Sequence, residues 1–178
     1  MLNQVIDFWF EEITAAQWWK KDADFDAQVT QRFASTLDAA LAGELADWRV
    51  TALGRLAEII VLDQFSRNIF RNDARSFAAD PMALALAQQS VALGVDRSLP
   101  SEQRCFLYMP YMHSESRWVH ERAVPLFTAL GQPSNLEFEL KHKAIIDRFG
   151  RYPHRNALLG RTSTAEELAF LEQPGSSF

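Results

Sequence analysis

The sequence predicts an all-α protein, a single domain of stacked antiparallel helix pairs over residues 1–178. Three observations favour this fold class. Apolar residues recur at helical spacing in nearly every segment, no segment alternates apolar and polar residues for long enough to form a strand, and short loops join successive helices. A chain of this length buries on the order of 70% of its unfolded surface, so one hydrophobic core can stabilise it.

The first half of the chain contains three expected helices. Residues 5–10 form an apolar amino-terminal helix, and apolar side chains recur every four residues from Phe25 to Leu41. Residues 51–65 are apolar on almost every side. Because that pattern is typical of a buried helix, we expect this segment at the centre of the core.

The second half carries clear helix start and stop signals. Asp80 is the expected N-cap of a helix that has Pro81 in its first turn and stops at Gly94. Another helix begins at Pro100 and is interrupted or kinked at Pro110.

The remaining helices follow from capping patterns. Residues 118–130 return to helix, Ser134 and Glu137 form a capping box for a helix over 135–149, and Pro153 opens a short helix. Two capping boxes compete for the start of the last helix, Ser163 with Glu166 and Thr164 with Glu167.

Composition excludes several classes of protein. The single cysteine, Cys105, excludes an internal disulfide and a multi-cysteine zinc site. The longest strongly apolar run, residues 59–62, is too short to span a membrane, and the first residues lack the positive charge of a signal peptide. Motifs for phosphate loops, dinucleotide binding, nucleophile elbows and metal ligands do not occur, so we expect no cofactor and no metal. We expect a cytoplasmic protein without a membrane partner.

Charge is distributed unevenly along the chain, although its net value is only −5. Residues 1–47 hold nine acidic and three basic residues, whereas residues 141–161 hold six basic residues and one acidic. Either the two segments neutralise each other in the fold, or the basic one is a localised anion site. Fourteen of the 18 basic residues are arginine, which favours bidentate pairing with carboxylate or phosphate. An acidic chain with one short basic cluster does not favour nucleic acid.

The first polar cluster lies where the 51–65 helix ends. Asp63, Arg67 and Arg71 are spaced four residues apart and share a helix face, with Asn68 beside them. A buried carboxylate at Asp63 would stay ionised next to Arg67 and orient its guanidinium group. The cluster could form one wall of an anion site, or a structural ion pair between packed helices.

The second polar cluster follows Pro110, at an expected break between helices. His113 and Glu115 could act as an acid and a base, or Glu115 could orient the histidine. The alternative is a loop histidine followed by a helix whose N-cap is Ser114.

The third polar cluster lies between residues 148 and 161. A glycine turn that leads into a helix begun by proline presents backbone N–H groups to an anion. Positive neighbours disfavour an imidazolium, so a largely neutral histidine here could accept a proton. The cluster offers one histidine for proton transfer and four arginines for anion binding: His154, Arg148, Arg151, Arg155 and Arg161. Alternatively, these arginines pair with the acidic amino-terminal region.

Three weaker signals favour structural roles. Cys105, in an apolar helix, is expected in the core. His142 stands between two lysines and is expected on a solvated helix face. Residues 18–21, two tryptophans followed by two lysines, could form a stacking lip, although aromatic pairs in helical proteins usually join the core.

Three segments of the chain carry motifs of a known bacterial family. They are LDQFSRNIFR at 62–71, FLYMP with HSE at 106–115, and RFGRYPHRN with LGR at 148–161. DFWF at 7–10 and WWK at 18–20 also match its opening, so the similarity covers nearly the whole chain. The sequence resembles domain-of-unknown-function family 924. The resemblance implies an all-helical fold grouped with the tetratricopeptide-like superfamily, and it implies no activity, cofactor or substrate.

We expect the three polar clusters to meet in one pocket. In this hypothesis the arginines bind an anionic small molecule that bears a phosphate or carboxylate, and Asp63 orients them. His113, Glu115 and His154 then provide acid and base groups. The alternatives are an open groove that binds an acidic peptide, without catalysis, and arginines that only join helices. A fold that placed the two histidines on opposite sides would exclude the pocket.

Overall fold

The computed structural model describes residues 1–177, and within that range the chain forms helices and no strand. The all-α class is therefore confirmed. None of the helices in this range is both long and apolar enough to span a membrane.

The α-helices are α1 (Leu2–Asp7), α2 (Ala15–Trp19), α3 (Ala23–Leu41), α4 (Ala52–Ile60), α5 (Ser66–Ile69), α6 (Asp80–Ala92), α7 (Ser101–Met112), α8 (Arg117–Leu130), α9 (Pro133–Phe149) and α10 (Ala165–Leu171). Shorter π-helical or 3₁₀ turns separate or extend them: η1 (Phe8–Glu12), η2 (Ala46–Val50), η3 (Val61–Phe65), η4 (Ala74–Phe77), η5 (Val95–Ser98) and η6 (Pro153–Arg155).

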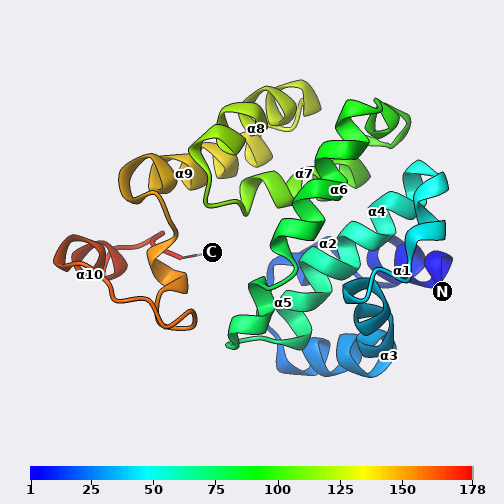
Figure 1. Ribbon diagram of the computed structural model, residues 1–178, viewed down its shortest axis with the longest axis horizontal. Coiled ribbons are helices and arrows are strands. Elements are labelled where there is room, and N and C mark those ends of the chain that lie inside the picture. The colour runs from blue at the N-terminus through cyan, green and yellow to red at the C-terminus, as the bar shows by residue number, and fades with distance from the viewer. Residues whose placement is uncertain (178) are drawn as a thin grey trace.

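The helices stack along the long axis of the molecule (Figure 1). Helices α7, α8 and α9 each pack on the next, while α4 contacts α1, α6 and α7. Helix α3 covers η3 and α5. The α10 segment lies at one end of the molecule and α1 and α3 at the other (Figure 1).

Aromatic side chains from distant segments build the core. The ring of Phe33 stacks on Phe65 with centroids 4.7 Å apart, and Trp9 meets Phe106 edge to face at 5.5 Å. All four are nearly inaccessible to solvent. Aromatic pairs of this kind stabilise a fold beyond their area burial, and here they attach the amino-terminal helices to η3 and α7.

Helix α4 is the central element, as its composition predicts. Leu56, Ile59 and Ile60 have no exposed surface. The helix continues directly into the π-helical turn η3, which carries Asp63 and Gln64 in buried positions. π-Helical turns are rare in proteins, and those that occur are often found at functional sites. The buried carboxylate in η3 therefore indicates a candidate site.

One predicted helix boundary is wrong, and at another the structure excludes one of two predicted alternatives. Asp80 is not an N-cap, because α6 begins at Asp80 itself and its carboxylate binds Arg67 and Arg155. Pro110 does not interrupt α7, which continues to Met112 with this turn buried.

Two further boundaries rest on capping boxes, with opposite outcomes. Ser134 and Glu137 do not cap α9, because the helix already begins at Pro133. Of the two candidates for the last helix, Thr164 with Glu167 forms the capping box.

The basic segment 141–161 is not neutralised by the acidic segment 1–47. Within residues 1–177 its bases pair with acids nearby or in the middle of the chain: Lys141 with Glu137, Lys143 with Asp147, Arg148 with Glu166, Arg151 with Glu167, Arg155 with Asp80 and Arg161 with Glu115. Three of these six pairs attach the carboxyl-terminal segment to the end of α9 and to the loop before α8, and the pair of Arg155 attaches it to α6. The acidic amino-terminal region instead pairs Asp26 with Arg71 and Glu12 with Arg32.

Candidate functional site

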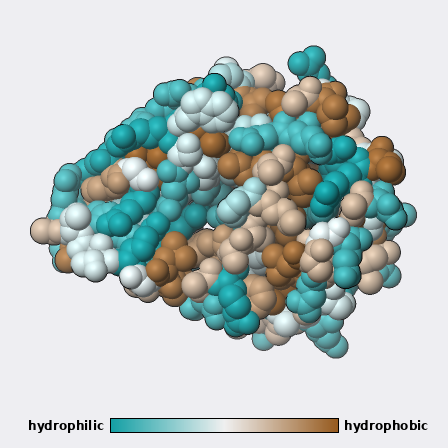
Figure 2. All heavy atoms as spheres, in the orientation of Figure 1, coloured by the Kyte–Doolittle hydropathy of each residue, from teal (hydrophilic) through white to brown (hydrophobic). Residues whose placement is uncertain are grey.

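A cleft of about 960 Å³ separates the carboxyl-terminal segment from the core. Figure 2 shows the surface hollowed between the α10 end of the molecule and α5. Its walls come from α2, α5, α7, α9 and η6, which are far apart in the sequence. The volume is within the range of sites that enclose small organic molecules.

All three polar clusters predicted from the sequence reach this cleft. The predicted residues that line it are Arg67, Asn68, Arg71, His113, His154 and Arg155. Asp63 lies directly behind this wall and is fully buried. His113 and His154 share one cavity, so the arrangement that would exclude a pocket does not occur.

The structure does not bring the other four predicted residues to the cleft: Glu115, Arg148, Arg151 and Arg161. Glu115 accepts two hydrogen bonds from Arg161, at 2.7 and 2.9 Å, and one from the backbone N–H of Tyr152 at 2.7 Å. Burial opposes its charge, but Arg161 holds the pKa of Glu115 below its usual range. Its contacts are those of a carboxylate that fixes a loop.

Arg148 and Arg151 are also engaged outside the cleft. Arg148 binds Glu166 at the surface, and Arg151 forms a bidentate pair with Glu167, at 2.6 and 2.8 Å. Both arginines attach α10 to the end of α9.

His113 and Asp63 form the most distinctive contact of the site. His113 Nδ1 lies 2.7 Å from Asp63 Oδ1, and the Asp63 side chain is only 1% exposed. Burial alone would raise the pKa of Asp63, but Arg67 and His113 outweigh it and hold that pKa well below its usual range. An ionised carboxylate accepts a hydrogen bond from Nδ1–H. In the neutral imidazole, this leaves a lone pair on Nε2.

Neutral imidazole is the favoured form of His113. Burial lowers the pKa of His113, and the charge of Asp63 offsets this only in part. Nδ1 of His113 is turned to the buried Asp63, and the side chain is 16% exposed and lines the cleft. This is the geometry of a general base held by a carboxylate.

Asp80 links two arginines of the site. It accepts hydrogen bonds from Arg67 at 2.9 and 3.0 Å and from Arg155 at 3.1 Å. Arg155 also donates to the backbone carbonyl of His113 at 3.0 Å, and Arg67 lies 3.2 Å from Asp63. These contacts close a ring that holds His113 by its side chain and by its main chain.

Positive groups form the polar surface of the cleft, and most carboxylates lie behind them. Among residues 1–177, five bases line it (Lys20, Lys21, Arg67, Arg71 and Arg155) and one acid, Glu102. Arg71 and Asn68 are both anchored from behind by Asp26. The cleft therefore presents cationic side chains to a ligand, as an anion site requires.

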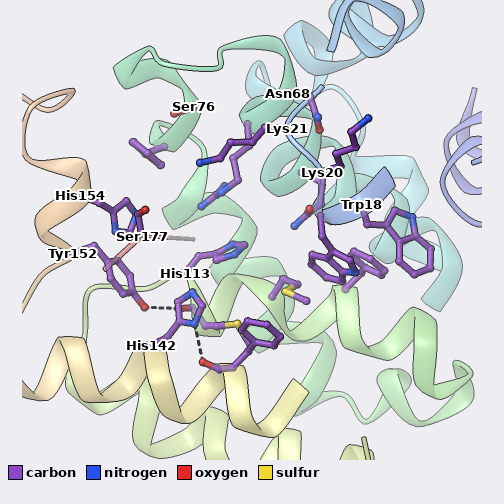
Figure 3. Close-up of a pocket in the computed structure, with 18 of the residues that line it drawn as sticks. Trp18, Lys20, Lys21, Asn68, Ser76, His113, His142, Tyr152, His154 and Ser177 are labelled. Carbon is purple, nitrogen blue, oxygen red and sulfur yellow. Dashed lines mark hydrogen bonds between the residues drawn. The ribbon is translucent and has the colours of Figure 1, made fainter. Parts of the chain in front are cut away.

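Two further histidines stand in the wall, and both favour the neutral form. Burial, assisted by Arg155, lowers the pKa of His154 to about 4. Burial lowers the pKa of His142 to about 3, against the effect of its hydrogen bond with the Phe138 carbonyl at 2.8 Å. Figure 3 shows both beside Tyr152, with His113 between them and the opposite wall.

The prediction that His142 lies on a solvated helix face is wrong. His142 is buried, not solvated, because α9 turns this face onto the cleft. The two lysines beside it point elsewhere, since Lys141 pairs with Glu137 and Lys143 with Asp147.

The tryptophan pair is a wall of the cleft and not only core. Trp18 is partly buried and Trp19 is 60% exposed, and both line the cavity together with Lys20 and Lys21. Cys105 is buried as predicted, yet it also lines the cleft. Burial raises the pKa of this thiol to about 12, so it is not poised as a nucleophile.

Asp80 and Tyr152 are the site residues that sequence reasoning missed. Asp80 reads locally as a helix N-cap, and only the tertiary fold turns it towards two arginines. Tyr152 belongs to the motif segment at 148–161, but no spacing in the sequence indicates that its hydroxyl donates to the Met112 carbonyl. Within residues 1–177 no three His, Cys, Asp or Glu side chains gather in a way that could hold a metal ion.

Comparison with known proteins agrees with this fold. The solved structure of a protein of unknown function from Agrobacterium tumefaciens, ATU0120, is similar over 96% of both chains, with 37% sequence identity and a TM-score of 0.91. No curated protein matches the chain. The family model described as "Bacterial protein of unknown function (DUF924)" matches residues 5–175. The chain therefore belongs to the DUF924 family of bacterial proteins.

Proposed function

We propose that this protein binds a small organic anion in the cleft and that His113 exchanges a proton with it. The observation that carries the proposal is the buried Asp63–His113 pair, which opens onto a cavity lined by arginines. A neutral imidazole beside fixed positive charge is suited to remove a proton from a bound acid or from an attacking group.

The anion would bind to side chains that the fold already holds in place. Arg67 and Arg155 are fixed by Asp80, and Arg71 is fixed by Asp26. Arg155 Nε is buried and has no hydrogen-bond partner among the described residues. Guanidinium groups anchored in this way lose little freedom when they bind carboxylate or phosphate.

The shape of the cleft favours a small molecule over a peptide. Trp18 and Lys21 from the amino-terminal part close one side, and His154 and Leu158 from the carboxyl-terminal part close another. An extended peptide needs a long open face, whereas segments from both halves of the chain line this cleft.

A thermal-shift screen against phosphorylated and carboxylated metabolites tests the proposal. A ligand at 100 times its dissociation constant adds about 2.7 kcal/mol, which raises the midpoint of a protein of this size by roughly 5–11 °C. Arg71→Gln and His154→Gln should each weaken a hit about tenfold or more, because both side chains line the cleft.

Arg148→Gln is the matched control, because Arg148 is also an ion-paired arginine but does not line the cleft. It should leave the affinity unchanged. Equal weakening by Arg148→Gln, or a screen without a single hit while all variants remain folded, would contradict the proposal.

A further inference from the structure

We infer that the ligand of this cleft is an organic acid whose carboxylate or phosphate is joined to a flat aromatic ring, and that the ring stacks on Trp19. The inference rests on the proposed function and names its ligand class. Anion binding and proton transfer do not explain why Trp18 and Trp19 line the cleft.

Trp19 is a flat apolar surface held from behind. Its ring stacks on Phe106 with centroids 5.8 Å apart and planes inclined by 10°. Trp18 supports it edge to face at 6.2 Å and is itself fixed, because its Nε1 donates to the Trp9 carbonyl at 2.9 Å. Although Phe106 and Trp18 pack against it, the residue is 60% exposed, so much of the indole surface is open to a ligand.

A second exposed tryptophan shows what is unusual about this one. Trp118, on α8, is 54% exposed, but the guanidinium group of Arg122 covers its ring at 3.3 Å. Among residues 1–177 no cation lies over the ring of Trp19. An uncovered indole in the wall of a cavity is a surface on which a planar ring stacks favourably.

The cleft has two chemically different walls. Trp19, Phe106, Met109 and Phe138 supply apolar surface, and Phe138 is itself 50% exposed. The wall opposite carries Tyr152, His154 and Arg155, while Lys20 lies beside the tryptophans. Figure 3 shows Trp18 and Lys20 on one side of the cavity, Tyr152 and His154 on the other, and His113 between them.

A ligand that matches both walls must have an apolar end and an anionic end. An inorganic anion would leave most of the cavity of about 960 Å³ and its whole aromatic wall unused. With its ring on Trp19 and its acid group towards Arg155, the ligand passes His113, which lies between Trp18 and His154 in Figure 3. The proton-transfer group then stands beside the part of the ligand that joins the ring to the acid.

Isothermal titration calorimetry with four probes tests this inference. The probes are 2-naphthoate, 2-naphthyl phosphate, acetate and 2-naphthalenemethanol. One or both naphthyl anions should bind at least tenfold more tightly than acetate and than the neutral alcohol, and their order shows whether carboxylate or phosphate is preferred. Trp19→Ala should weaken the better naphthyl anion about five- to tenfold, Trp19→Phe much less, and Trp118→Ala not at all.

Failure of this inference can be told apart from failure of the proposed function. If acetate binds in a way that Arg71→Gln weakens, but the naphthyl anions bind no better or are insensitive to Trp19→Ala, the aromatic ligand class is wrong and the anion site stands. If none of the anions binds to the folded protein, both are wrong. Because Trp19 is largely exposed, both Trp19 variants should fold.

Discussion

Two histidine–carboxylate pairs in this protein have the same length and opposite surroundings. His113 Nδ1 lies 2.7 Å from Asp63, and His120 Nδ1 lies 2.7 Å from Glu139. The His113 side chain is 16% exposed and lines the cleft, whereas both side chains of the His120 pair are completely buried between α8 and α9.

The two histidines have different hydrogen-bond partners. His120 Nε2 lies 2.8 Å from the carbonyl oxygen of Ser114, which can only accept, so Nε2 carries a hydrogen. In His113 it is Nδ1 that donates, to the ionised Asp63. Protein groups therefore occupy both nitrogens of His120, whereas His113 is held at Nδ1 and its ring lines the cleft.

The carboxylates differ for an equally simple reason. Burial raises the pKa of Glu139, with only partial opposition from His120, and its Oε2 has no partner among the described residues. Burial therefore disfavours the charged form of Glu139 relative to that of an exposed glutamate. Asp63 is just as buried, yet it has Arg67 beside it. One neighbouring arginine and an open side separate a candidate catalytic pair from a structural one.

The largest effect on stability is expected at the sealed pair. Glu139→Ala removes a buried hydrogen bond and leaves a cavity, so the free energy of unfolding should fall by about 3–5 kcal/mol. Denaturant titration measures this change. Glu137→Ala on the same helix is the control, because Glu137 only forms an exposed pair with Lys141 and its loss should not be measurable. Similar stabilities of the two variants would contradict the structural role of Glu139.

The next effect is a loss of stability in acid that comes from histidines of the cleft. The folded-state pKa values of His142 and His154 are about 3 and about 4, below the roughly 6.5 of an unfolded chain. As the pH falls below about 6.5, the unfolded chain therefore takes up protons that the folded chain does not. These two residues should reduce stability by about 2–3 kcal/mol per pH unit around pH 5, and by nothing above pH 7.5.

His142→Asn isolates one of these contributions. The asparagine amide can still donate to the Phe138 carbonyl, but it does not titrate. The slope of unfolding free energy against pH should decrease by about 1.4 kcal/mol per pH unit around pH 5. An unchanged slope would show that His142 is protonated in the folded protein.

The same contrast explains what could be predicted from the sequence. The helical class, the central position of residues 51–65 and the three polar clusters follow from local patterns, because periodicity and caps act over a few residues. Which cluster members face a cavity is decided by tertiary contacts. Arg155 and Arg161 are similar in sequence context, yet one reaches Asp80 in the cleft wall and the other Glu115 behind the loop.

The sequence predicts the wrong environment for residues whose sequence neighbours are typical of another environment. His142 stands between lysines and is nevertheless buried, and Asp80 precedes a proline and nevertheless binds two arginines. His120 carries no motif at all, so its buried pair with Glu139 could only be found from the packing of α8 on α9.

A smaller effect is expected at Glu115, a third carboxylate close to these histidines in the sequence. Glu115→Gln weakens the pair with Arg161 but keeps a hydrogen-bond acceptor, so stability should fall by about 1–2 kcal/mol. Affinity for a cleft-bound anion should not change, because Glu115 does not line the cleft. Calorimetric titration of the variant with 2-naphthoate checks this. A tenfold loss of affinity would contradict the prediction and show that Glu115 contributes to ligand binding.

The smallest effect on stability is expected at His113 itself. His113→Asn keeps a donor to Asp63 in the place of Nδ1 and removes only the edge of the ring that faces the cleft, so unfolding free energy should change by less than about 1 kcal/mol. His120→Asn keeps a hydrogen-bond partner for Glu139 but removes the one that His120 Nε2 gives to the Ser114 carbonyl in the interior, at a cost of about 1–3 kcal/mol.

Chemical modification of the unsubstituted protein distinguishes His113 from His120. Diethyl pyrocarbonate acylates accessible neutral imidazole, so mass spectrometry of the folded protein should find His113 modified and His120 intact. A bound anion should protect His113, because ligand and reagent compete for the same side of the ring. If His120 reacts as fast as His113, or if His113→Asn is the more destabilised variant, then the cleft does not distinguish the two pairs and His113 loses its role as the proton-transfer group.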